Sequence, residues 1–127
     1  MTKYEYIWLD GTKPTGQLRS KTRVMQLPDS PQISDFPEWS FDGSSTQQAQ
    51  GNESDCLLQP VNFVLDPLYE GGDYLVLCEV MNSDGSVHTS NTRALLRKVL
   101  ENGGAKADLW LGFEQEYTMF KKNIPLG

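Results

Sequence analysis

The sequence is poor in residues that would cross-link the chain or insert it into a membrane. Its two cysteines, Cys56 and Cys78, allow at most one disulfide and form no CxxC pair. With His88 as the single histidine, the chain lacks the ligands of a structural zinc site. No apolar window has the length of a membrane-spanning helix, and the first residues do not resemble a secretory signal. We therefore expect reduced thiols, a cytoplasmic location and no membrane partner.

Positive charge is also scarce. Eleven Lys and Arg residues face seventeen Asp and Glu residues, which gives a formal net charge of -6. Such a chain repels the phosphates of nucleic acid on average, so we expect no nucleic-acid partner and favour cationic ligands. The 127 residues, 38% of them hydrophobic, fit a single folded domain with one core.

Two stretches near the N-terminus alternate with the period of a β-strand. In residues 4–11 the aromatic side chains share one face, and the stretch ends in an Asp-Gly turn. In residues 18–25 the basic side chains share one face, which we interpret as a solvent-facing side, with a phosphate site as the alternative. The residues of the two faces are Tyr4, Tyr6, Trp8 and Asp10, and then Arg19, Lys21 and Arg23.

The middle of the chain predicts a strand followed by a helix. Residues 73–81 are nearly all apolar, as in a central strand covered on both faces. Ser90 or Asn91 can cap a helix that begins at residue 92 and stops at the glycines 103 and 104. Its apolar face comprises Leu95, Leu96, Val99 and Leu100. A mostly antiparallel sheet packed against one main helix, an α+β fold, is the simplest arrangement.

Residues 108–120 alternate again and predict a final strand, which places Glu114 and Glu116 together on one face. Their Cα atoms would lie about 6.5 to 7 Å apart, close enough for both carboxylates to approach Mg²⁺ or Mn²⁺. From spacing alone, a solvated polar face is the favoured reading. The flanking Trp110 and Phe120 indicate instead that this face is partly covered.

Three further polar residues are candidates of lesser weight. Asp42 lies in the turn sequence FDGSS, which is ordinary surface-turn chemistry, although Trp39 and Phe41 could anchor it so that it reaches a site elsewhere. Glu79 interrupts an apolar strand, and we expect neighbours to satisfy its charge. His88 has no evident partner, and we assign it no special role.

Taken in order, the stretches LRSKTR, PEWSFDGSS, GNESD, LCEV, NTR and GFEQEYT resemble the N-terminal region of glutamine synthetase, particularly the eukaryotic-like class II form. The resemblance covers nearly the whole chain. It implies a β-grasp-like N-terminal domain over residues 1–120, in agreement with the sheet and helix expected above. Residues 121–127 would then begin a linker to a C-terminal catalytic domain that lies outside this sequence.

The resemblance implies a reaction of nitrogen metabolism, the ATP-dependent ligation of ammonia to glutamate through γ-glutamyl phosphate. It places Glu114 and Glu116 among the ligands of magnesium or manganese. Asp42, with Ser45 beside it, would serve the ammonium site of the adjacent subunit in a homo-oligomeric ring. Complete proton transfer from an ammonium to an aspartate is uphill by roughly 9 kcal/mol. Asp42 should therefore bind the cation and accept a proton only as the nucleophile adds.

In the family that this sequence resembles, the C-terminal domain carries most of the metal ligands and the nucleotide and glutamate contacts. We therefore expect the isolated chain to be inactive and to hold a metal poorly. The stretch TQQAQGN after the turn lacks the tryptophan that some family members place there. Two alternatives stay open: a stand-alone β-grasp interaction module without the chemistry, and a simple divalent-cation protein.

Overall fold

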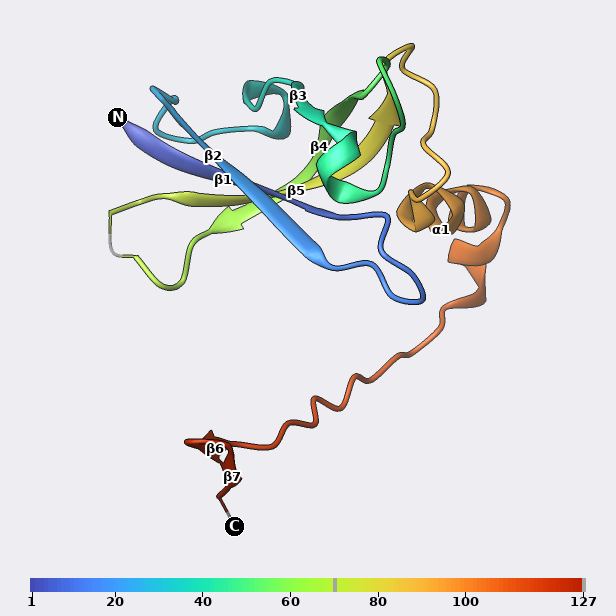
Figure 1. Cartoon of the computed structure of the whole chain (residues 1–127). Coiled ribbons are helices and arrows are strands. Elements are labelled where there is room, and N and C mark those ends of the chain that lie inside the picture. Colours follow the sequence, from blue (N-terminus) through green and yellow to red (C-terminus); the bar gives the residue numbers. More distant parts are fainter. Residues whose placement is uncertain (70, 127) are drawn as a thin grey trace.

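The computed structural model describes residues 1–69 and 71–126. It shows a curled sheet of five strands in the order β2-β1-β5-β4-β3, with the helix α1 at one end (Figure 1). All neighbouring strands are antiparallel except β1 and β5, which are parallel. The predicted α+β, β-grasp-like fold is confirmed. The main elements are β1 (Thr2–Leu9), β2 (Leu18–Met25), β3 (Trp39–Asp42), β4 (Asp55–Leu65), β5 (Tyr74–Asn82) and α1 (Thr92–Glu101).

Aromatic residues build the core on one face of the sheet. The predicted alternation of β1 is confirmed, because Tyr4, Tyr6 and Trp8 are all buried. The core also contains Phe36, Phe41, Cys56, Leu58, Val76, Cys78 and Val80. The strand β5 occupies the predicted central position, but its Leu77 is 40% exposed, so it is not covered on both faces along its length. Both cysteines are free, and both are buried.

The prediction that the basic side of β2 faces solvent holds for Arg19, which is exposed, but is wrong for Lys21 and Arg23, which are half-buried on the side of the sheet that carries the aromatic core. Lys21 Nζ lies 3.6 Å from the ring centroid of Trp39 and donates a hydrogen bond to the carbonyl of Ser40. Arg19 pairs with Asp10. The side chains exposed on the opposite face of the strand include Leu18 and Val24. An aromatic ring and a carboxylate on the inner side attract the cations, which decides the orientation of this edge strand.

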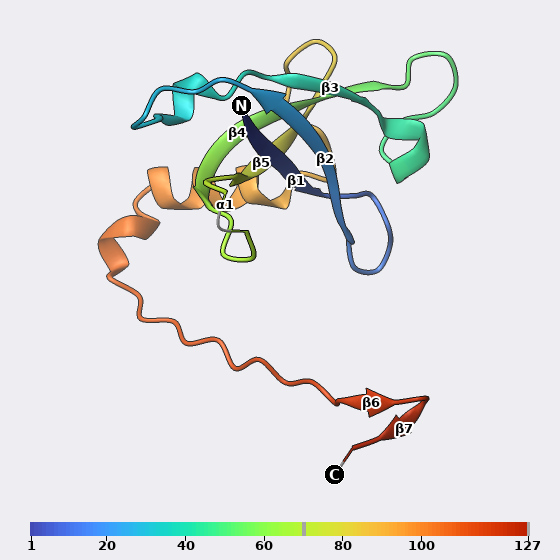
Figure 2. The ribbon, with the colours of Figure 1, turned by 90° about the vertical axis from the view of Figure 1, so that its left-hand side faces the viewer.

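The helix α1 begins where the sequence predicts, with Asn91 as its cap: Asn91 Oδ1 accepts a hydrogen bond from the Ala94 amide. Its predicted apolar face is exposed, and Ala94 is its buried residue. An ion pair network ties the helix to the sheet, since the carboxylate of Glu79 on β5 binds Arg93 at 2.9 Å and Arg97 at 3.0 Å. The expectation that neighbours satisfy the charge of Glu79 is confirmed. Figure 2 shows α1 alongside the sheet.

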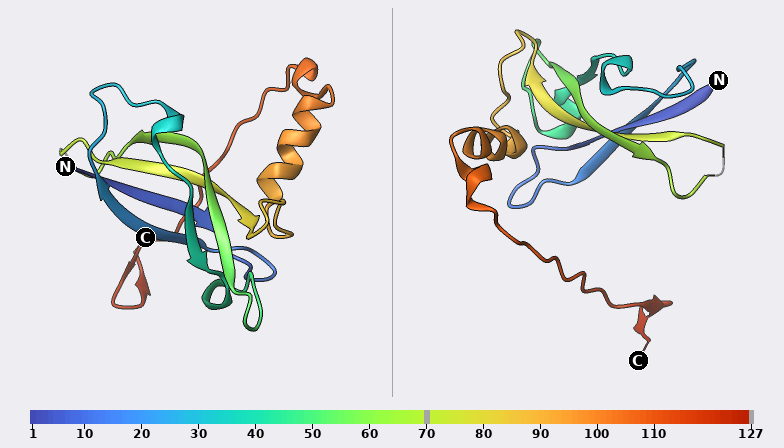
Figure 3. Two further views of the ribbon diagram at one scale, coloured as in Figure 1. Left: turned by 90° about the horizontal axis from the view of Figure 1, so that it is seen from above. Right: turned by 180° about the vertical axis from the view of Figure 1, so that it is seen from behind.

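The predicted final strand over residues 108–120 is wrong. Residues 108–119 form an extended segment without regular secondary structure that leads away from the sheet (Figures 1 and 3). An alternating pattern shows which residues suit a half-covered strand, but a strand also needs a neighbouring edge with which to exchange hydrogen bonds. A short hairpin of β6 (Phe120–Lys121) and β7 (Ile124–Pro125) follows, and Gly127, the end of the expected linker, lies outside the described residues.

Three short 3₁₀ helices complete the described structure, namely η1 (Ile33–Asp35), η2 (Gly43–Thr46) and η3 (Gly104–Ala107). Of these, η2 follows β3 directly and carries the Asp42 turn. Over residues 1–69 and 71–126, no helix is both long and apolar enough to cross a membrane.

Candidate functional site: the Asp42 turn

Asp42 ends β3 and caps the short helix η2, so its backbone belongs to the sheet while its side chain is exposed to solvent. One carboxylate oxygen, Oδ1, accepts hydrogen bonds from the backbone amide and the hydroxyl of Ser44, at 2.9 and 2.6 Å. Ser44 makes no bond to the other oxygen, Oδ2, and the hydroxyl of Ser54 also lies close enough to the carboxyl to lower its pKa. The turn therefore orients the carboxylate through Oδ1.

The electrostatics of the turn favour the charged form of Asp42. The hydroxyl of Ser44 and then its backbone amide hold the pKa of the Asp42 carboxyl below its usual value. Because both donors stabilise the ionised carboxylate, Asp42 carries a full negative charge at neutral pH. A fixed anion at the surface suits the binding of a small cation.

The two serines of the turn make different hydrogen bonds. Ser45, the residue expected beside Asp42, donates from Oγ to the backbone carbonyl of Asp42 at 2.9 Å. Ser44 is the residue that contacts the carboxylate, and sequence reasoning missed it. An aspartate that receives the amide two positions later is a known turn signature, so the spacing contained the signal.

The turn packs closely against the start of β4. The Gly43 amide donates to the carbonyl of Ser54 at 2.7 Å. A Cβ added at Gly43 would lie 2.7 Å from the sulfur of Cys56 and 3.0 Å from the Cβ of Ala49, so only glycine fits there without rearrangement. Close packing at Gly43 therefore fixes the position of the turn, and of the preceding residue Asp42, relative to β4.

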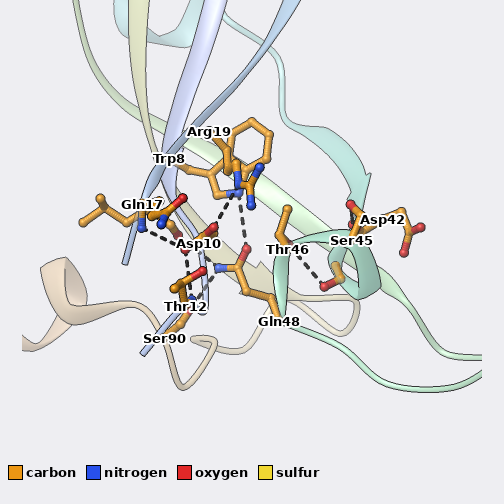
Figure 4. Close-up of polar contacts among 12 residues, drawn as sticks. Trp8, Asp10, Thr12, Gln17, Arg19, Asp42, Ser45, Thr46, Gln48 and Ser90 are labelled. Carbon is orange, nitrogen blue, oxygen red and sulfur yellow. Dashed lines mark hydrogen bonds and ion pairs between the residues drawn. The ribbon is translucent and has the colours of Figure 1, made fainter. Parts of the chain in front are cut away.

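A hollow of about 330 Å³ opens beside the turn. Figure 4 shows Asp42 and Ser45 on the outer side, with Thr46 and Gln48 between them and the Asp10–Arg19 pair. The two cations of the hollow, Arg19 and Lys21, are already engaged by Asp10 and by Trp39. Its lining residues are Trp8, Arg19, Ser20, Lys21, Phe41, Asp42, Ser45 and Thr46.

The buried carboxylate of Asp10 organises the inner side of this region. It accepts hydrogen bonds from the backbone amides of Thr12 and Gln17 and from Arg19 Nε, at 2.9, 2.8 and 2.8 Å. The Gln17 amide, followed by the Thr12 amide and Arg19, holds the pKa of Asp10 well below its usual range. Both carboxylate oxygens accept hydrogen bonds from the protein and the residue is buried, so Asp10 has a structural role in the turn between β1 and β2.

The second predicted pair, Glu114 and Glu116, lies on the exposed segment of residues 108–119. Neither glutamate has a hydrogen bond or ion pair within the described residues, and neither lines the hollow at Asp42. Carboxylate oxygens are the donors that Mg²⁺ and Mn²⁺ prefer, so the pair fits such an ion in chemistry. The pair supplies too few ligands by itself, because residues 1–69 and 71–126 hold no group of three or more potential metal ligands.

His88 forms hydrogen bonds with Gln48 and Ser90, so the expectation that this imidazole has no partner was wrong. The side chain is 9% exposed and lies 2.6 Å from the backbone carbonyl of Gln48, forty positions away in the sequence. The sequence offers no signal for this contact, because it depends on how two loops meet.

Comparison with known proteins places these observations in a family. The family model described as glutamine synthetase, beta-Grasp domain, matches residues 1–83, which include all five strands of the main sheet and the Asp42 turn. A glutamine synthetase of Streptomyces viridochromogenes is 51% identical over 125 residues, which cover 98% of this chain and 36% of the relative. A glutamine synthetase of Bradyrhizobium diazoefficiens is 50% identical over 130 residues, with 100% and 36% covered.

A chloroplastic glutamine synthetase of Chlamydomonas reinhardtii is 49% identical over 125 residues, with 93% of this chain and 33% of the relative covered. The chain thus spans about a third of the length of these curated relatives.

Proposed function

Because the chain belongs to the glutamine synthetase family, as its β-grasp domain, we propose that it is the N-terminal part of an ATP-dependent glutamate–ammonia ligase. The observation that carries this proposal is the geometry of Asp42, an exposed carboxylate that Ser44 holds at Oδ1 and keeps ionised. The remaining two-thirds of the relatives' length would supply the ATP and glutamate sites. The isolated chain is then inactive.

In this proposal Asp42 binds ammonium at the edge of a neighbouring subunit's site. The oxygen Oδ2 accepts a hydrogen bond from the cation, while Ser44 keeps the carboxylate ionised and correctly oriented. Ser45 stabilises the turn and lies on the wall of the same hollow. Ammonium must lose a proton to free the electron pair that forms the C–N bond, so Asp42 would accept that proton as the nitrogen attacks the acyl carbon and phosphate leaves.

Glu114 and Glu116 would provide two of the oxygen ligands of a magnesium or manganese ion, with the rest of the enzyme completing the set. When bound, such an ion neutralises charge on the phosphate oxygens during phosphoryl transfer. In keeping with that role, both glutamates are exposed on a segment that the main sheet does not engage. A surface of this kind is suited to contact with another part of a longer protein.

The exposed position of the Asp42 turn also supports the proposal that the complete protein forms a homo-oligomeric ring with sites between subunits. We further propose residues 1–120 as the functional unit and residues 121–127 as the start of the connection. We also propose a cytoplasmic location, although one relative is named chloroplastic.

A hybrid enzyme tests the role of Asp42. This chain replaces the matching N-terminal third of the Streptomyces viridochromogenes glutamine synthetase, and glutamine formation is measured with ammonium varied. Asp42→Asn should lower kcat/KM for ammonium by about 100-fold, since the substitution removes a charge that acts directly on the reacting cation.

The chain offers a matched control at Asp84. Its carboxylate also caps an Asp-Gly-Ser turn, accepting from the amide and hydroxyl of Ser86 at 2.9 and 2.6 Å, and its pKa is lowered by the same kinds of donor. Asp84→Asn should leave the ammonium dependence unchanged. Equal losses in the two variants would show that the capping of a turn, rather than a role in the site, explains the effect.

A further inference from the structure

The turn that carries Asp42 is held from its far end by the buried side chain of Gln48. Gln48 Oε1 accepts a hydrogen bond from Trp8 Nε1 at 3.3 Å. Its Nε2 donates to the backbone carbonyl of Leu9 at 3.1 Å and to the hydroxyl of Ser90 at 2.8 Å. One side chain thus joins the end of β1, the turn and the loop before α1 (Figure 4).

The backbone of Gln48 is held by His88. The ring nitrogen Nδ1 accepts a hydrogen bond from the Ser90 amide at 3.1 Å, so the proton of the neutral ring resides on Nε2. Nε2 then donates to the carbonyl of Gln48 at 2.6 Å. Both ring nitrogens of His88 are hydrogen-bonded and the residue is buried, so the imidazole ring is held in a single orientation.

Hydrogen bonds connect Gln48 to Gly43, the residue that follows Asp42. The Gln48 amide donates to the carbonyl of Gly43 at 2.8 Å, and the hydroxyl of Thr46 donates to the same carbonyl at 3.1 Å. The Gly11 amide donates to the carbonyl of Thr46 at 2.8 Å, and a Cβ on Gly11 would overlap the carbonyl oxygen of Gln47. The turn is therefore held by Gly11 at Thr46 and by Gln48 at Gly43. We expect a shift of Gln48 to move Gly43 and with it the neighbouring Asp42.

We propose that His88 and Gln48 are positioning residues for the ammonium site: they contact no substrate and fix the turn so that Asp42 Oδ2 reaches the neighbouring subunit at the required place. This inference rests on the function proposed above for Asp42. A misplaced carboxylate weakens an interaction with a reacting group even when the fold is intact. The effect should consequently appear in the ammonium dependence rather than in the other substrates.

The hybrid enzyme provides the test. His88→Leu removes the donor to Gln48 and should raise KM for ammonium about tenfold, with KM for ATP and glutamate within about twofold of the parent. His88→Gln places an amide donor close to the position of Nε2 and should restore most of the ammonium affinity. Rescue by this variant would show that the hydrogen bond to Gln48, rather than the volume of the imidazole ring, determines the KM for ammonium.

Tyr6→Phe is the matched control. It deletes another hydrogen bond to a backbone carbonyl, the part-buried one from the Tyr6 hydroxyl to Pro37 at 2.8 Å, which includes neither His88 nor Gln48. The ammonium KM of this variant should equal that of the parent. If His88→Leu changed all three KM values alike, or if Tyr6→Phe reproduced its effect, the positioning role would be overturned and a general loss of stability would remain.

Two further results keep the inference distinct from the function on which it rests. If Asp42→Asn leaves the ammonium dependence intact, the proposed function itself fails. If Asp42→Asn impairs it and His88→Leu does not, the positioning role alone fails.

Should His88→Leu not fold, Ser90→Ala removes the acceptor of Gln48 Nε2 and should give a smaller rise in the same KM. In the 127-residue chain, amide exchange at residues 43–49 should accelerate about tenfold in the same variants, while β5 stays protected. Unchanged exchange at the turn would also overturn the proposal.

Discussion

Asp10 and Arg19 form an ion pair 2.8 Å long in which the carboxylate side chain is fully buried and the guanidinium side chain is 43% exposed. The carboxylate also receives two backbone amides from the turn that joins β1 to β2. A single side chain therefore closes that turn and holds the edge strand beside the candidate site.

Part of the loss of stability on acidification should come from Asp10. Its pKa is lowered in the folded state, so its contribution is complete above the unfolded value of about 4 and is lost as the pH falls toward the folded value. Asp10→Asn should reduce the free energy of unfolding by about 1 to 3 kcal/mol at neutral pH and by much less near pH 2. Urea unfolding of both proteins across this range measures the difference. A difference independent of pH would contradict the assignment.

The attachment of α1 should depend on Glu79. Its carboxylate is 1% exposed and binds two arginines of the helix, so Glu79→Ala leaves both guanidinium groups without their partner. We expect a loss of about 3 kcal/mol in unfolding free energy and faster amide exchange in α1. Glu101→Ala, at the exposed end of the same helix, is the control and should change neither quantity. Loss of helix protection in both variants would argue against the ion pairs.

The packing under the Asp42 turn should tolerate no added methyl group. Gly43→Ala brings a Cβ to 2.7 Å from Cys56 Sγ, and we expect a loss of about 1 to 3 kcal/mol with displacement of the turn. Gly112→Ala adds the same group where no atom lies within 4 Å and should be nearly neutral. Thermal unfolding and the amide shifts of residues 42–49 report the two effects. Equal melting temperatures would refute the packing argument.

The isolated chain should bind manganese weakly. Two glutamates supply a minority of the roughly six oxygen ligands that a hard cation needs, so the dissociation constant should be about 1 mM or weaker. Calorimetric titration of the chain measures it, with Glu114→Gln and Glu116→Gln as references. Saturation at micromolar concentrations would favour the simple divalent-cation protein over part of a larger enzyme.

The exposed apolar face of α1 should make the isolated chain associate. Leu96 and Val99 are 57% and 60% exposed one helical turn apart, beside Leu95 and Leu100. The double variant Leu96→Lys and Val99→Lys should shift sedimentation at high concentration toward the monomer. Gln26→Lys with Ser30→Lys, which adds the same charge at exposed loop positions, should not. If both double variants dissociate alike, charge rather than apolar contact controls association.

The local pattern of the chain sufficed to predict β1, β2, β5 and α1, because alternation and helical periodicity report which side chains a single element can bury. It also sufficed to indicate the family, since the ordered short motifs are specific where each alone is weak. The strand β4 runs past an irregularity in its pairing with β5 between Pro60 and Asn62, which no local pattern indicates.

The sequence by itself thus determined the types of β1, β2, β5 and α1, the aromatic core face and the chemistry available at Asp42, Glu114 and Glu116, all of which depend on neighbours in the chain. Only the tertiary structure decided that the cations of β2 turn inward to Trp39 and Asp10, that residues 108–119 leave the sheet, and that His88 binds Gln48. These outcomes depend on contacts between segments distant in sequence. Which edge, ring or carbonyl comes within reach is a property of the assembled fold, because no local period encodes it.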